Sequence, residues 1–129
     1  MSAPAEAQLA RLVEMAARDP EILAVMLFGS QARGDGGPTS DTDVCLVLGD
    51  AAASGRASEK RLDYLAEADL DISIYQQLPL HIRVRVLKDG RVLFVRDEDA
   101  LYEVAFRTVR AYEDFKHIQR LYLDEIARG

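Results

Sequence analysis

Residues 27–43, LFGSQARGDGGPTSDTD, combine a small-residue turn with a pair of carboxylates. The apolar run of residues 22–28 ends at Gly29-Ser30, a pattern that predicts a buried strand followed by a turn. Ten residues separate Ser30 from Asp41, and a single residue separates Asp41 from Asp43. A phosphate site would explain the glycines, and a metal site would explain the acids. A protein that handles a metal-bound nucleotide would need both.

Two familiar phosphate-binding loops do not fit this turn. A P-loop requires a lysine where this chain has Asp35, whose negative charge would repel phosphate. The glycines also do not follow the G-x-G-x-x-G spacing of dinucleotide-binding loops. A turn that opens a helix at Ser30 remains, because helix N-termini present free N–H groups and a partial positive charge. Gly29 would let the backbone approach the phosphate and Arg33 would help to neutralise it; a plain strand–helix turn is the alternative.

The two aspartates begin a second predicted strand, residues 44–48. Because Asp41 and Asp43 are two residues apart, their carboxylates leave the strand on the same face. Magnesium accepts one or two carboxylates together with waters and substrate phosphates. A solvated loop end, with the acids capping a turn, is the alternative.

A third carboxylate comes from residues 70–74, where apolar and polar residues alternate and predict a third strand. Asp69 and Asp71 both lie on its polar side. If this strand neighbours the second one, either aspartate can join the pair, and three convergent carboxylates can hold two metal ions. The alternative is that these acids only keep the outer face of the sheet soluble.

The length and composition limit the class of protein. The chain has 129 residues, which predicts a single domain over residues 1–129. Its net charge of −6 argues against direct binding of nucleic acid. Residues 2–18 predict an amphipathic helix without a targeting signal, and no apolar run is long enough to cross a membrane. We therefore expect a cytoplasmic protein. The single cysteine, Cys45, lies in an apolar run, which predicts a buried, inert thiol.

The middle of the chain is less clearly patterned. Residues 51–58 are small and polar and predict a mobile connection, and residues 60–66 predict a short helix. Residues 79–95 fit two structures. Alternating apolar residues and the turn dipeptide Asp89-Gly90 predict a hairpin, which the pattern slightly favours. The other structure is a helix that begins at Pro79 and ends at Gly90.

From Asp97 onward the spacing predicts one long helix. Its apolar residues are separated by steps of three or four: Leu101, Ala105, Val109, Tyr112, Phe115, Ile118, Tyr122 and Ile126. Covering the sheet is the favoured role for this face. The alternative is that part of it serves a protein partner.

Residues 29–43 resemble the nucleotidyltransferase signature Gly-Ser, ten residues, Asp-x-Asp. The similarity is closest to the minimal nucleotidyltransferases, the MNT domains encoded beside HEPN-domain proteins in toxin–antitoxin pairs. Residues 32–34 and Ser40 also match, while Gln31 departs from the arginine or tyrosine often found there. Similar segments follow at residues 70–73, 87–94 and 112–116. The resemblance selects Asp71 over Asp69, and it favours the helix for residues 79–88.

The resemblance implies a fold and a reaction. The fold is of the α/β (α+β) class: a small mixed sheet flanked by helices, as in polymerase-β-like nucleotidyltransferases, with a long C-terminal helix. The reaction is transfer of AMP from Mg-ATP to a tyrosine hydroxyl of a cognate HEPN ribonuclease toxin, with release of pyrophosphate. An antitoxin that only caps its toxin and a nucleotidyltransferase for small molecules are the alternatives, although the latter usually carries an additional helical domain.

The resemblance also implies the roles of individual residues. Gly29 and Ser30 hold the β- and γ-phosphates, with Arg33 nearby. The ligands of two magnesium ions are Asp41, Asp43 and Asp71. Asp71 also draws the proton off the acceptor hydroxyl.

Overall fold

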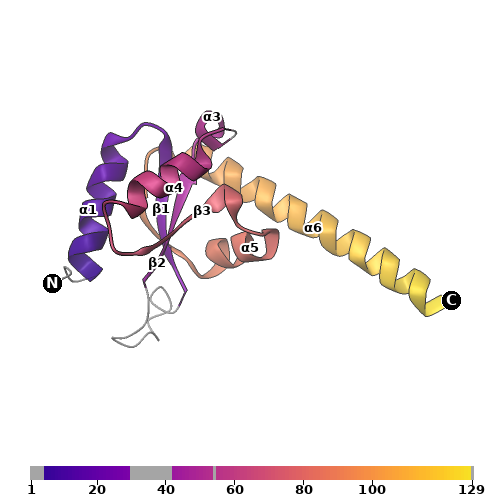
Figure 1. The fold of residues 1–129 in the computed structure, drawn as a ribbon. Helices are drawn as coiled ribbons and strands as arrows, with labels where there is room; N and C mark the ends of the chain where they lie inside the picture. The colour runs from indigo at the N-terminus through magenta and orange to yellow at the C-terminus, as the bar shows by residue number, and fades with distance from the viewer. Residues whose placement is uncertain (1–4, 30–41, 54, 129) are drawn as a thin grey trace.

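The computed structural model describes residues 5–29, 42–53 and 55–128 of the chain (Figure 1). They contain a four-stranded sheet in the order β3-β2-β1-β4. The strands are β1 (Ile22–Phe28), β2 (Asp43–Leu48), β3 (Asp71–Ile74) and β4 (Arg91–Val95). β1 lies antiparallel to both β2 and β4, whereas β2 and β3 are parallel. The sheet is therefore mixed, and the predicted fold class is confirmed.

Helices cover both faces of the sheet because its central strands alternate between two apolar clusters. On one face, α1 (Ala5–Arg18) and α4 (Ala57–Leu65) pack on the side that carries Val25 and Leu46. On the other face, the short 3-10 helix η1 (Tyr75–Gln77), α5 (Leu80–Asp89) and the start of α6 (Glu98–Arg128) pack against Met26, Cys45 and Val47. Burial raises the pKa of the Cys45 thiol to about 12, as expected for an inert, buried thiol.

Two local predictions are wrong. The hairpin at residues 79–95 is instead α5 followed by β4, so the helix that the resemblance favoured is confirmed. Val86 is fully buried and Gly90 ends the helix, its N–H donating to the Val86 carbonyl at 2.8 Å. Tertiary burial of one side of α5 decides against the local alternation. The predicted connection at residues 51–58 also contains helix, since α3 spans Asp50–Ala53 and α4 begins at Ala57.

The predicted C-terminal helix is confirmed as α6, but its apolar face does not cover the sheet along its length. Only Val104 and Thr108 of α6 are buried. Tyr75 and Thr108 share a buried hydroxyl–hydroxyl hydrogen bond, which ties the first turns of α6 to the domain. Within α6, the Thr108 hydroxyl donates to the Val104 carbonyl. Beyond Thr108 the helix extends away from the sheet (Figure 1), and its large apolar side chains are exposed: Val109, Phe115, Ile118, Leu121, Tyr122, Leu123 and Ile126.

A network of ion pairs joins α1, α4 and β1 at the end of the sheet where β1 begins. The buried Lys60 amine lies 2.8 Å from the carboxylates of both Asp19 and Glu21. The hydroxyl of Tyr64 also donates to Asp19, at 2.9 Å. Arg96 donates to the carbonyls of Ala16, Ala17, Asp19 and Ile22, so its guanidinium binds the carbonyls at the end of α1 and joins them to the start of β1.

Candidate active site

The candidate site forms where β1 ends and where β2 and β3 begin. Phe28, the last residue of β1, pairs with Asp43, the first residue of β2. Asp43 in turn pairs with Asp71, the first residue of β3. Paired positions on adjacent strands lie about 5 Å apart and point to the same face of a sheet. The fold thus brings Asp43 and Asp71 side by side, although 27 residues separate them in the chain.

Both aspartates lie on the sheet face that carries α5 and η1. Asp43 is two residues before the buried Cys45, which faces that side. The side chain of Asp71 lies on the same side of β3 as that of Ser73, two residues further on. It points away from the face on which Ile72 is buried. Asp71 is exposed and Asp43 is partly buried. Two oxygen-donor carboxylates at neighbouring strand ends suit a hard divalent cation, so the residues present fit the metal that the resemblance implies.

Gly29 forms the turn directly after β1. Its φ of +79° lies in the left-handed region, which glycine adopts at little cost. A Cβ atom at this position would lie 2.5 Å from Oδ2 of Asp43. The turn therefore requires glycine for its conformation and also for the close approach of the Asp43 carboxylate.

Three of the residues that sequence analysis singled out, Ser30, Arg33 and Asp41, lie outside the described residues. Asp69 does not join the site: it precedes β3, and its backbone N–H donates to Oε1 of Gln8 at 2.9 Å. Among the described residues, no group of three potential metal-ligating side chains gathers in one place. Asp43 and Asp71 are thus the part of the proposed triad that can be located.

A small cavity that sequence analysis did not predict borders the Gly29 turn. Its volume is about 220 Å³, and its described lining residues are Phe28, Gly29, Ile82, Arg85 and Asp89. The last three are separated by three and four residues, so they share one face of α5. This spacing could have been recognised from the sequence only by choosing the helix over the hairpin for this segment.

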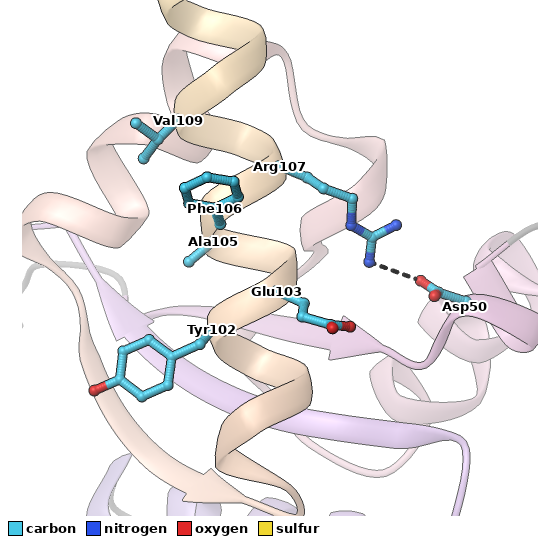
Figure 2. A pocket seen from close by; sticks show the side chains of 7 residues that line it. All are labelled: Asp50, Tyr102, Glu103, Ala105, Phe106, Arg107 and Val109. Carbon is cyan, nitrogen blue, oxygen red and sulfur yellow. Dashed lines mark hydrogen bonds and ion pairs between the residues drawn. The ribbon is translucent and has the colours of Figure 1, made fainter.

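A larger cavity, of about 800 Å³, lies elsewhere, along α6. Arg107 of α6 reaches Asp50 of α3 at 3.0 Å, while Tyr102 and Phe106 point to the other side of the helix (Figure 2). Among its described lining residues, the carboxylates are those of Asp50 and Glu103, and Asp50 is already paired with Arg107. We therefore place the candidate site at the strand ends and not in this cavity.

The helices in the described part of the chain include none that is both long and apolar enough to cross a membrane.

The protein-family model described as polymerase beta, nucleotidyltransferase, matches residues 10–99 of the chain. Among curated proteins, the chain is 29% identical over 98 residues to a Methanocaldococcus jannaschii protein named as a protein adenylyltransferase. That alignment covers 74% of each protein. Residues 10–99, which the family model matches, contain every residue of the candidate site.

Solved structures share the fold. A chain from a toxin–antitoxin crystal structure with AMP-PNP matches with a TM-score of 0.63 and 19% identity, over 95% of this chain and 98% of that one. A chain from the complex of a tri-AMPylated Shewanella oneidensis HEPN toxin with its MNT antitoxin matches with a TM-score of 0.57 and 18% identity, over 94% of both chains. At these identities the likeness establishes the architecture, long α6 included.

Proposed function

This chain belongs to the polymerase beta nucleotidyltransferase family, and from that membership we propose that it transfers AMP from ATP to a tyrosine hydroxyl of a HEPN ribonuclease toxin. It would thereby act as the antitoxin of the pair. The observation that carries the proposal is the register that sets Asp43 beside Asp71, next to the Gly29 turn. The adenylyltransferase name of the archaeal relative supports AMP as the transferred group. The fold shared with a chain from a complex of HEPN toxin and MNT antitoxin supports the partner.

The proposed ligands for two magnesium ions are Asp41, Asp43 and Asp71. Bound there, magnesium supplies charge neutralisation at the phosphates and lowers the pKa of the acceptor hydroxyl. Gly29 brings the backbone close to the β- and γ-phosphates, Ser30 donates a hydrogen bond to them, and Arg33 adds positive charge.

The chemical step is an in-line displacement at the α-phosphorus. Asp71 accepts the proton of the tyrosine hydroxyl as the tyrosine oxygen bonds to phosphorus. The bond between the α-phosphorus and the bridging oxygen breaks, and the electron pair leaves with pyrophosphate. The protein contributes positioning and charge stabilisation, as is usual for phosphoryl transfer.

A second candidate function is an antitoxin that only caps its toxin. The exposed apolar side chains of α6 favour it, because such a surface suits a protein partner in the absence of any chemistry. The two functions differ in whether protection of the cell requires the carboxylates.

Asp71→Asn separates the two functions. We expect AMP transfer to fall about 10²–10⁴-fold, the contribution of a positioned general base, while the toxin stays bound. The matched control is Asp69→Asn, which removes the same charge two residues away without touching the register with Asp43. Co-expression with the toxin, with mass spectrometry for AMP on tyrosine, measures both protection and modification. Protection by Asp71→Asn without modified toxin would leave the cap as the function.

A further inference from the structure

Helix α5 is basic in an otherwise acidic chain. It carries Arg83, Arg85 and Lys88 against a single acid, Asp89, whereas the whole protein has a net charge of −6. The helix packs on the same sheet face that carries Asp43 and Asp71, as the burial of Val86 with Cys45 and Met26 indicates. Positive charge is thus concentrated beside two acidic groups, on the face where a nucleotide would bind.

The cavity next to Gly29 contains one of these cations. Arg85 is the only positively charged group among its described lining residues, which also include Asp89. The cavity lies toward the C-terminal end of α5, where the helix carbonyls add partial negative charge. The guanidinium is therefore the feature that would make this cavity attractive to an anion.

The guanidinium of Arg85 is also not paired with an acid of the described chain. Within the part of the chain that the structure describes, it forms no ion pair, although Asp89 follows it by one helical turn. Three other surface arginines of the described chain are paired with acids: Arg11 with Glu67, Arg56 with Glu21 and Glu59, and Arg107 with Asp50. A guanidinium in this state presents all of its N–H groups to a ligand.

The sheet order gives the direction along which a nucleotide would lie. Asp71 is on β3, Asp43 on β2 and Gly29 at the end of β1, and α5 packs on this face of the sheet against β1. The proposed acceptor lies at Asp71, so the leaving group of an in-line displacement must lie on the opposite side, toward Gly29. That side is where Arg85 lines the cavity.

We propose that Arg85 binds the β- and γ-phosphates of the nucleotide and stabilises pyrophosphate as it leaves. This inference rests on the proposed nucleotidyl transfer and adds a residue to it. A guanidinium can bind two phosphate oxygens through two parallel N–H···O hydrogen bonds. Such charge-assisted hydrogen bonds strengthen as negative charge accumulates on the leaving oxygen. Asp89 faces the same anion with like charge, so it opposes binding.

The test measures binding of magnesium tripolyphosphate and magnesium pyrophosphate by calorimetry, without any transfer reaction. Arg85→Gln should weaken both about tenfold to a hundredfold, and Arg85→Lys should keep part of the affinity. Lys88→Gln is the matched control, since it removes one charge from α5 outside the cavity, and its effect should stay within about twofold. Asp89→Asn should bind the probes as tightly as the wild type or more tightly. Thermal unfolding checks that each variant is folded.

Three results would overturn the inference: unchanged affinity in Arg85→Gln, an equal loss in Lys88→Gln, or weaker binding in Asp89→Asn. Failure of the wild type to bind either probe would overturn it as well. AMP transfer to the toxin is assayed separately. If the wild type transfers AMP and Arg85→Gln binds the probes normally, only the role of Arg85 is wrong. If probe binding depends on Arg85 but no AMP is transferred, the proposed function is wrong and the anion site stands.

Discussion

At the scale of single residues, the site depends on a glycine and on two aspartates that share a register. Gly29 and Asp43 could both be identified from the sequence, because the signature fixes their spacing. The choice of Asp71 over Asp69 could not be made from alternation alone, since both acids fall on the polar side of the strand. The structure separates them because β3 begins at Asp71, directly opposite Asp43. Arg85 was not foreseen, because its position depends on how α5 packs against the end of β1.

Gly29→Ala should damage both folding and the site. The left-handed backbone costs an alanine about 1–2 kcal/mol, and the new Cβ would have to displace the Asp43 carboxylate. We expect a lower free energy of unfolding in urea and weaker Mg-ATP binding by calorimetry. Gly49→Ala is the control, since its Cβ would meet only the Glu21 carbonyl, at 3.9 Å. Equal effects of the two substitutions would contradict this account of the turn.

At the scale of elements, β1, β2 and β3 follow from the sequence because their apolar residues are buried as local rules predict. The long helix follows from the spacing of its apolar residues, although most of them are exposed. Residues 79–90 are different: alternation of Ile82, Val84 and Val86 fits a strand, but Val86 is buried as part of one helical face. Nothing local to the segment can show which period the core will satisfy. The sequence equally gave no sign that Lys60 would be buried between α1 and α4, since its acidic partners lie some 40 residues away.

The ion-pair network that joins α1, α4 and β1 predicts a loss of stability in acid. Burial alone would raise the pKa of Asp19, but hydrogen bonds from Lys60, the Glu21 backbone and Tyr64 outweigh it and hold the pKa below its usual value of 3.8. The unfolded chain therefore binds the proton more readily, so the stabilisation is present above pH 3.8 and disappears as the pH falls through the lower, folded pKa.

Asp19→Asn tests this dependence. The variant should be less stable than the wild type at pH 7, by roughly 1–3 kcal/mol, because the buried Lys60 amine loses a charged partner. It should also lose less stability than the wild type between pH 5 and pH 2, as measured by urea unfolding at each pH. Asp63→Asn, on the exposed side of α4, is the control. Parallel pH profiles for the wild type and Asp19→Asn would show that another group carries the acid sensitivity.

At the scale of the whole molecule, the far half of α6 contributes little to the free energy of folding of the domain. In the described chain, no α6 residue after Thr108 is buried, and α6 is about 46 Å long at 1.5 Å per residue. The length of this helix follows from its sequence period. The sequence does not show where α6 stops packing against the domain, because its apolar residues continue well past the edge of the domain. Whether the exposed part serves a partner stays a prediction.

Removal of residues 112–129 should therefore leave the domain folded. We expect a cooperative thermal transition within a few degrees of that of the full chain, together with retained Mg-ATP binding, because the truncation takes away no buried contact. Circular dichroism and calorimetry measure the two properties. A matched deletion that begins at Val104 removes the buried Val104 and Thr108 and should lower the transition strongly. Loss of the folded state in the shorter deletion would show that the exposed half of α6 stabilises the domain.

The parallel pairing of β2 with β3 also has a consequence for the folding pathway. β1 and β2 are antiparallel neighbours, but Asp43 meets Asp71 only after the intervening chain has formed α3 and α4 and returned to the sheet. Such crossovers must close a long loop before their contacts repay the lost entropy, so they form late and slowly. A refolding chain would therefore pair β1 with β2 first and set Asp71 beside Asp43 afterwards. A newly made molecule would thus become competent for catalysis only after this crossover has closed.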